Sequence, residues 1–199
     1  MPVCEGCGTK TDDLHIQRRL QRAELARKFR PAQIRVLYLD VAPPARSEDF
    51  FYRAAAVRST RSLASRMFFD ELARAMGAAP GSEIVEDLAL AEFERRSFFL
   101  THAIECPLEE VDQPQTAMRR VAPTVIKRVQ TEYDPAYIVP LGKSTQELIR
   151  LFGLIGWGDR LVLDKGGPFV DPYLGDPQRQ AAAGSAFGER IQKMLAALP

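Results

Sequence analysis

The chain has 199 residues, of which 46% are hydrophobic and 27% are charged, and these values predict a single soluble globular domain over 1–199. No apolar run approaches the roughly 20 residues of a membrane helix, and no signal peptide is recognisable, so we expect a cytoplasmic protein with no membrane partner. Three cysteines are an odd number, which argues against a secreted disulfide framework. The net charge of +1 neither favours nor excludes nucleic acid.

Helices and strands are predicted to alternate along the chain. Within an N-terminal segment at 1–30, Cys4 and Cys7 precede a basic helix over 12–29, with Asp12 as its cap. Short apolar runs predict buried strands, at 34–39, 98–104, 137–141 and 160–163. Helical spacing predicts the remaining helices, at 60–76, 86–96, 116–132, 142–152 and 184–197. This alternation predicts an α/β fold with three αβα layers and a central four-stranded parallel sheet.

The loops that follow the four predicted strands are the places where a ligand would bind, because parallel sheets bind ligands outside the carboxyl ends of their strands. The first loop offers carboxylates, a stiff proline pair and aromatic rings: Asp40, Glu48, Pro43, Pro44, Phe51 and Tyr52. Such residues form a preorganised pocket wall on which a base could stack. A loop that caps a helix and buries its aromatic rings in the core explains them equally well.

The second loop begins with His102, which suits a pocket hydrogen bond, a metal ligand or a purely structural role. In the third loop, Lys143 and Ser144 lie where a strand turns into a helix, and backbone N–H groups at a helix start attract phosphate. The fourth loop has Gly166 and Gly167, which allow close backbone approach. Two further residues of this loop would then project into a cleft: Asp171 and Tyr173.

Cys4 and Cys7 have the spacing of metal ligands. Cys106 offers a third ligand and either His15 or His102 a fourth, which gives a Cys3His zinc set. An iron–sulfur cluster prefers four thiolates and the chain has three cysteines, so zinc is favoured. Three unrelated thiols remain the simplest alternative.

Arginines and lysines are concentrated in two segments, which suits either phosphate contacts or solvated helix faces. The first segment contains Arg18, Arg19, Arg22, Arg27, Lys28 and Arg30. The second contains Arg53, Arg58, Arg61 and Arg66.

Taken in order, these loops resemble the uracil-DNA glycosylase superfamily, and most closely its iron–sulfur-bearing branch. The similarity runs from Cys4 to the C-terminus, with a longer N-terminal insert. The matching segments are Cys4-x-x-Cys7, Asp40-Val41-Ala42-Pro43-Pro44 with Glu48, Asp49 and Phe51, Thr101 to Pro107, Pro135 to Gly142, and Asp171-Pro172-Tyr173. The resemblance implies a glycosylase-like fold and an enzyme that hydrolyses N-glycosidic bonds in DNA.

Four positions depart from that branch. Val41 replaces a glutamate or glutamine, His102 the asparagine that reads the base, and Asp171 the catalytic histidine. Ala122 aligns with the fourth cluster cysteine, which leaves zinc or no metal as alternatives to a cluster. If His102 lines the pocket, as the resemblance implies, His15 is the better fourth metal ligand.

The resemblance also implies roles for the loop residues. A glycosylase flips a nucleotide into a pocket, and a carboxylate stabilises the sugar cation and directs a water molecule. Asp40 or Glu48 would serve here, with Asp171 as a further candidate. His102 would read or protonate the base. The remaining expected contacts are a stacking ring from Phe51 or Tyr52, a pocket wall at Val41, and DNA contacts from Lys143, Ser144, Gly166, Gly167 and Tyr173.

Because the asparagine is absent, we do not expect excision of ordinary uracil. Small side chains at Val41 and Ala42 suit a larger base, such as the glucosylated hydroxymethylcytosine of phage DNA, in antiviral defence. The partner would be DNA, and the protein a monomer. Two alternatives are a catalytically degenerate DNA-binding module of the same fold and a nucleotide or sugar-phosphate enzyme on a similar sheet.

Overall fold

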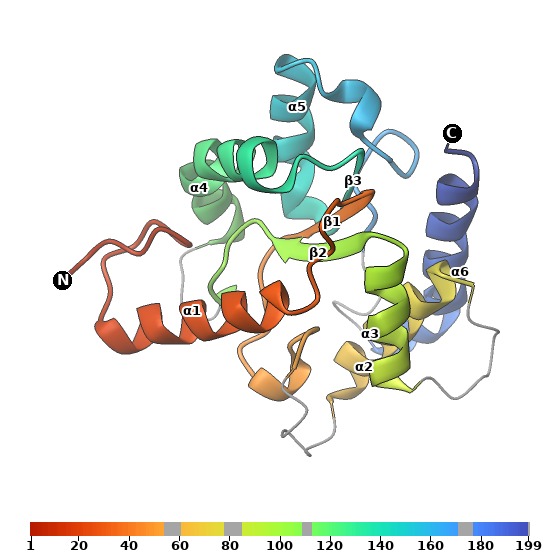
Figure 1. The fold of residues 1–199 in the computed structure, drawn as a ribbon, viewed down its shortest axis with the longest axis horizontal. Helices are drawn as coiled ribbons and strands as arrows, with labels where there is room; N and C mark the ends of the chain where they lie inside the picture. The colour runs from red at the N-terminus through yellow and green to blue at the C-terminus, as the bar shows by residue number, and fades with distance from the viewer. Residues whose placement is uncertain (54–60, 78–84, 109–112, 171–176, 199) are drawn as a thin grey trace.

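Three parallel strands form the centre of the fold (Figure 1). The computed structural model describes residues 1–53, 61–77, 85–108, 113–170 and 177–198, with the side chains of 177–186 excepted. The strands are β1 (Val36–Asp40), β2 (Phe98–His102) and β3 (Tyr137–Pro140), in the order β2-β1-β3. The prediction of an α/β fold with a parallel sheet is therefore confirmed.

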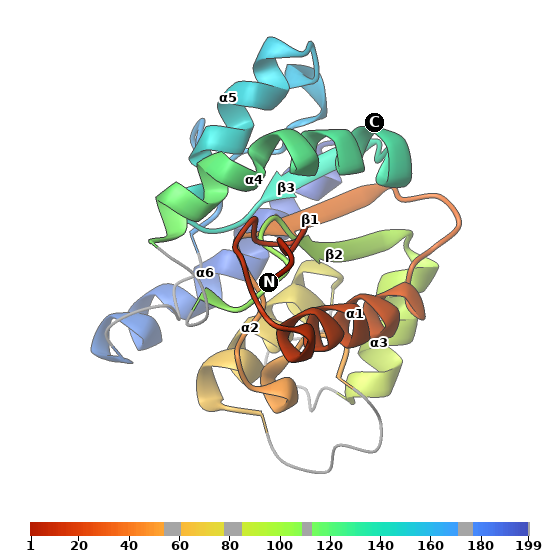
Figure 2. The same cartoon turned by 90° about the vertical axis from the view of Figure 1, so that its left-hand side faces the viewer.

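The central strand is apolar because both of its faces are covered. Leu37, Tyr38 and Leu39 have no exposed surface, which is the expected state of a parallel strand between two helical layers. Helices α4 and α5 lie on one side of the sheet, and α2 and α3 lie on the other (Figures 1 and 2). The helices are α1 (Asp13–Arg27), α2 (Leu63–Ala75), α3 (Glu86–Arg95), α4 (Pro114–Arg128), α5 (Gln146–Leu154) and α6 (Pro177–Ala196).

The expected fourth strand at 160–163 is present only as an isolated bridge. Leu161 pairs in parallel with Ile138, and the Val162 N–H donates to the Ile138 carbonyl at 2.9 Å. The chain then turns through Gly166, at φ +83°, before Phe169 bridges Leu141. This early turn ends the pairing, so the described sheet has three strands and the predicted four-stranded sheet is not confirmed.

Side chains protect the outer edge of β2, the strand at the end of the sheet. The Tyr52 hydroxyl accepts a hydrogen bond from the Leu100 N–H at 2.7 Å. Arg128 of α4 donates to the His102 carbonyl at 2.7 Å. Backbone groups at a sheet edge need such partners when the edge is covered. The second bond fixes α4 beside the end of β2, where the candidate site lies.

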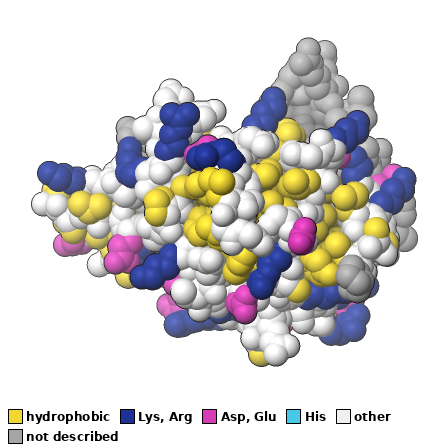
Figure 3. Space-filling model, turned by 90° about the horizontal axis from the view of Figure 1, so that it is seen from above, with side chains coloured by type: hydrophobic (Ala, Val, Ile, Leu, Met, Phe, Trp, Pro, Cys, Tyr) yellow, Lys and Arg dark blue, Asp and Glu magenta, His cyan; other side chains and the backbone are white. Residues whose placement is uncertain are grey.

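Hydrophobic side chains and basic side chains are interspersed on the face seen in Figure 3, and no histidine is visible there. His15 and His102 are both buried, with 8% and 9% of their surface exposed. Among the described helices, none combines the length and apolar character needed to cross a bilayer.

Candidate functional site

Four side chains expected to bind metal lie together in the structure. The ligand atoms of Cys4, Cys7, His15 and Cys106 are all within 4.8 Å of one another. The Sγ atoms of Cys4 and Cys106 are 3.6 Å apart, and Cys7 Sγ lies 3.5 Å from His15 Nε2. A tetrahedral ion with metal–sulfur bonds of about 2.3 Å sets its sulfur ligands roughly 3.8 Å apart. The cluster therefore has the dimensions of a site for one tetrahedral ion.

Local turns bring these ligands together. The Gly8 N–H donates to the Cys4 carbonyl at 2.7 Å, and Gly8 adopts a φ of +70°, a conformation that glycine adopts without strain. The Asp12 side chain accepts from the His15 N–H at 2.8 Å, so the predicted cap is confirmed. This cap starts α1, whose first turn holds the buried His15. Cys106 comes from the loop after β2.

The cysteines are free thiols with no disulfide between them. Burial, together with the neighbouring thiols of Cys7 and Cys4, raises the pKa of the Cys106 thiol. A cation would supply the positive charge that three buried thiolates require. Four protein ligands leave no open position, which is the arrangement of a structural metal site and not a catalytic one.

His102 lies outside the metal cluster and beside Asp40. Its Nε2 atom is 3.9 Å from Asp40 Oδ2, and its ring centroid is 6.0 Å from that of Phe50. Burial, with smaller contributions from the positive charges of Arg128 and Arg22, lowers the pKa of His102 to about 3. The imidazole is therefore neutral at physiological pH and can donate one hydrogen bond while it accepts another.

A cavity of about 390 Å³ opens at the carboxyl ends of β1 and β2. Four predicted site residues line it together: Asp40, Val41, Phe51 and His102. The Val41 N–H donates to Asp40 Oδ1 at 2.7 Å, which fixes the carboxylate at the strand end. The structure thus brings the expected carboxylate and histidine into one pocket, as the topology of a parallel sheet requires.

Arg61 holds the wall of this cavity in place. Its guanidinium is buried and donates to the carbonyls of Phe50 and Phe51, both at 2.9 Å. The Glu86 carboxylate forms an ion pair with Arg61, with 3.1 Å between Oε1 and Nε. It also pairs with Arg53, with 2.8 Å between Oε2 and Nε. These two arginines therefore have structural partners and do not form a free basic face.

Other predicted site residues lie elsewhere. Tyr52 is fully buried, with its ring stacked on Phe29 and its hydroxyl bonded to Leu100, so it is a core residue and not a stacking ring in the cavity. Glu48 does not line the cavity, and Asp49 does.

The predicted DNA-contact residues that the structure describes do not line the cavity. Lys143 is exposed in a short 3-10 helix at Lys143–Thr145, which also contains Ser144, and neither residue lines the cavity. The same holds for Gly166 and Gly167. Three further predicted residues lie outside the described residues: Arg58, Asp171 and Tyr173.

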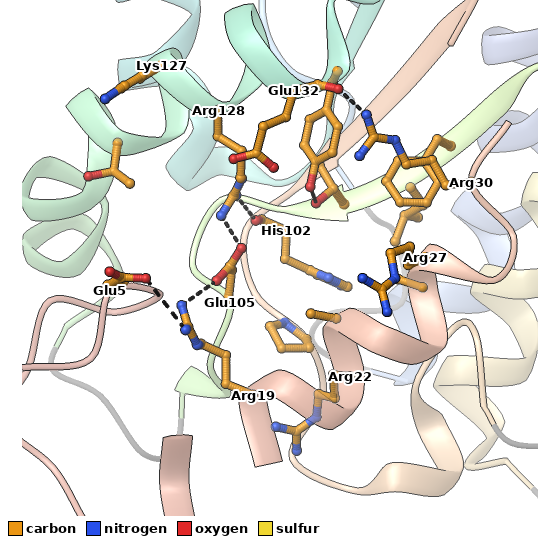
Figure 4. A pocket seen from close by; sticks show the side chains of 18 of the residues that line it. Glu5, Arg19, Arg22, Arg27, Arg30, His102, Glu105, Lys127, Arg128 and Glu132 are labelled. Atoms are coloured by element: carbon orange, nitrogen blue, oxygen red, sulfur yellow. Dashed lines mark hydrogen bonds and ion pairs between the residues drawn. The ribbon is translucent and has the colours of Figure 1, made fainter. Parts of the chain in front are cut away.

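A second cavity, of about 640 Å³, forms a groove between α1 and α4 that sequence reasoning did not anticipate (Figure 4). Its basic residues are Arg19, Arg22, Arg27, Arg30, Lys127 and Arg128, and its acidic residues are Glu5, Glu105 and Glu132. The arginine-rich segment at 12–30 indicates a basic surface on α1, which forms one wall. No sequence pattern predicts that α4 forms the opposite wall, because α1 and α4 are far apart along the chain.

Comparison with protein-family models, with curated proteins and with solved structures finds no match to this chain. The function is therefore argued from the arrangement of the side chains. Three features define that arrangement. They are a closed metal-ligand cluster, a pocket that holds Asp40 and His102, and a basic groove beside it.

Proposed function

We propose that the protein is a DNA glycosylase that removes a modified base and leaves an abasic site. The observation that carries this proposal is a carboxylate beside a neutral imidazole in the lining of one cavity. Asp40 and His102 are 3.9 Å apart there. The volume of about 390 Å³ lies in the range of roughly 300–1,000 Å³ that is usual for small-molecule pockets.

In the proposed reaction, the N-glycosidic bond breaks and its electron pair leaves with the base. The Asp40 carboxylate stabilises the cation that forms on the sugar and accepts a proton from the water molecule that attacks it. His102, being neutral, donates a hydrogen bond to the departing base, where negative charge develops. A neutral imidazole can act as such an electrophile in a buried site. Water thus supplies the new hydroxyl group on the sugar, and its proton passes from the Asp40 carboxyl through solvent to the departed base, which restores the carboxylate.

The pocket walls suit a base larger than uracil. Val41 and Ala42 are small side chains in the lining, and His102 stands where a uracil-reading asparagine would be expected from the resemblance. Phe51, the lining member of the predicted stacking pair, offers an apolar wall for a base. We favour a hypermodified cytosine, such as glucosylated hydroxymethylcytosine of phage DNA, as the substrate in an antiviral role. The three-stranded parallel sheet supports a uracil-DNA glycosylase-like fold for this chain.

The metal ion of this proposal is zinc. Three thiolates and one imidazole form a Cys3His set, which zinc accepts in structural sites. An iron–sulfur cluster spreads its ligands around several iron atoms and prefers four thiolates, whereas these ligand atoms lie within 4.8 Å. When bound, zinc would stabilise the thiolates and hold Cys4, Cys7 and His15 against Cys106. These residues then fix the N-terminal segment and the start of α1 to the loop after β2.

The test is incubation with oligonucleotides that carry uracil, hypoxanthine, hydroxymethylcytosine or glucosyl-hydroxymethylcytosine. Alkali cleaves the strand wherever an abasic site has formed. Cleavage of a modified substrate is expected, with little cleavage at uracil. If no base is released from any of these substrates while DNA binding is intact, the proposal of an enzyme is wrong, and a catalytically degenerate DNA-binding module is favoured.

A further inference from the structure

The groove between α1 and α4 has the charge of an anion-binding site. Six basic side chains line it against three carboxylates. Glu105 pairs with Arg19, at 3.0 Å, and with Arg128, and Glu5 lies 3.7 Å from Arg19, so these two cations engage two of the three carboxylates. The groove therefore keeps an excess of positive charge, which a bound anion would balance.

Among the described residues, two cations of the groove lack side-chain partners, and two others have one unpaired N–H group each. Within the described part of the chain, no hydrogen bond or ion pair engages the side chain of Arg27 or of Lys127, and the two side chains are exposed on opposite walls. Arg128 is 9% exposed, and its Nε atom is buried without a hydrogen-bond partner. The Nε atom of Arg19 is in the same state. Buried donors without partners are rare in folded proteins and mark a place where a ligand can accept the bond.

Figure 4 shows that these side chains reach the groove from two directions, Arg19, Arg22 and Arg27 from α1 and Lys127 and Arg128 from α4. Arg30 lies with its guanidinium 5.0 Å from the centre of the Tyr133 ring. Tyr133 is half-buried and lines the groove, so an aromatic surface accompanies the basic side chains. Basic walls with an aromatic ring between them are the elements that bind single-stranded nucleic acid.

The groove adjoins the cavity that holds Asp40. Pro43, Leu100 and His102 line both spaces, so the groove and the cavity share a wall. We propose that the groove binds the phosphates of a single nucleic-acid strand. This inference deepens the proposed function and rests on it, since it takes the groove as the path of the strand whose base enters the cavity. A flipped nucleotide has left its duplex, so its neighbours need a surface of this kind.

The experiment measures binding of a fluorescent oligothymidine to the zinc-loaded full chain over a range of salt concentrations. Unmodified thymidine contains no target base, so the result does not depend on base release. In the double variant Arg27→Ala/Lys127→Ala, both substitutions remove exposed side chains without partners, and folding should be unaffected. The matched control is Arg150→Ala/Lys193→Ala, which removes the same two charges from exposed positions outside the groove.

The groove variant should bind several-fold more weakly than the control. The slope of log affinity against log salt concentration should fall by about 1.4, because each lost phosphate contact on a single strand removes roughly 0.7. Equal weakening in both variants would show a general charge effect and overturn the proposal. If a duplex of the same length binds as tightly as the single strand or more tightly, the proposed preference for a single strand is wrong. If glycosylase activity is absent but this difference persists, the groove stands and the proposed chemistry fails.

Discussion

Asp40 and His102 end two neighbouring parallel strands in register with each other, and their side chains approach to 3.9 Å. The pairing of β1 with β2 sets this relationship, because residues opposite one another in a sheet place their side chains on the same face. The carboxylate is anchored by the Val41 N–H and the histidine is buried. The pair is therefore positioned before any substrate binds.

Replacement of Asp40 by asparagine should abolish most base release. The amide keeps the shape of the side chain and can still accept from the Val41 N–H, but it carries no negative charge for the sugar cation and accepts no proton from water. We expect a loss of about 10² to 10⁴ in rate, measured as abasic sites formed per unit time. Asp159→Asn, at an exposed position, is the control and should retain full activity. Unchanged activity of Asp40→Asn would remove this residue from the mechanism.

His102 should make the protein sensitive to acid. Its pKa is about 3 in the folded chain, because of burial, and roughly 6.5 when unfolded. Between these values the unfolded chain binds the proton, so stability falls as pH drops from about 6.5 toward 3. Chemical denaturation over this range should show a shallower loss in His102→Gln than in the wild type. The same loss in both proteins would show that other groups, such as the metal ligands, govern acid unfolding.

Local signals in the sequence were sufficient for most of the secondary structure and for the metal ligands. Asp12 caps α1 as predicted, the apolar run at 34–39 covers all of β1 except Asp40, and the run at 98–104 contains β2. Cys4, Cys7 and Cys106 lie together because the loop after β2 packs against the N-terminal turn, where the Glu105 N–H donates to the Gly6 carbonyl at 3.0 Å. The residues alone left His15 and His102 open as the fourth ligand, and the choice of His15 came from the resemblance, which implies that His102 lines the pocket.

The remaining features depend on contacts that a sequence pattern does not contain. Tyr52 is an aromatic residue of the type that stacks on bases. Its hydroxyl, however, accepts a hydrogen bond from the Leu100 N–H at the outer edge of β2, and its ring is buried in the core. The segment 160–163 has the pattern of a strand, but the following turn leaves only one bridge to Ile138. Arg27 and Lys127 line the same groove because α1 and α4 lie on either side of it, and no local sequence pattern predicts that arrangement.

Gly142 should tolerate no side chain. It has a φ of +77°, and a Cβ atom there would lie 2.8 Å from Val41 Cγ2 in the cavity wall. Gly142→Ala should therefore lower the free energy of unfolding by more than the roughly 1 kcal/mol of a left-handed alanine, because the clash adds to it. Gly153→Ala, within α5 and with nothing within 4 Å, should instead be neutral or stabilising. Denaturant midpoints of the two variants test this contrast, and equal midpoints would contradict it.

Metal removal should release the first turns of α1 from the domain. The only buried residue of this helix is His15, a candidate metal ligand, and the hydrophobic residues that pack against the core, Leu25 and Ala26, lie near its end. Binding of structural zinc contributes on the order of 10 kcal/mol in small zinc domains, and this free energy is coupled to folding. A chelator should therefore make the segment 1–20 sensitive to proteolysis while the sheet remains protected. Metal analysis of untreated protein should find one zinc per chain.

Substitution separates this effect from a general action of the chelator. His15→Asn should reproduce the proteolytic sensitivity without chelator, because it removes one of four ligands, whereas Gln17→Ala changes an exposed side chain of the same helix and should behave as wild type. Because α1 forms one wall of the groove, His15→Asn should also weaken oligothymidine binding. Protection of the segment in His15→Asn would show that packing alone holds α1, and iron in the purified protein would contradict the assignment of zinc.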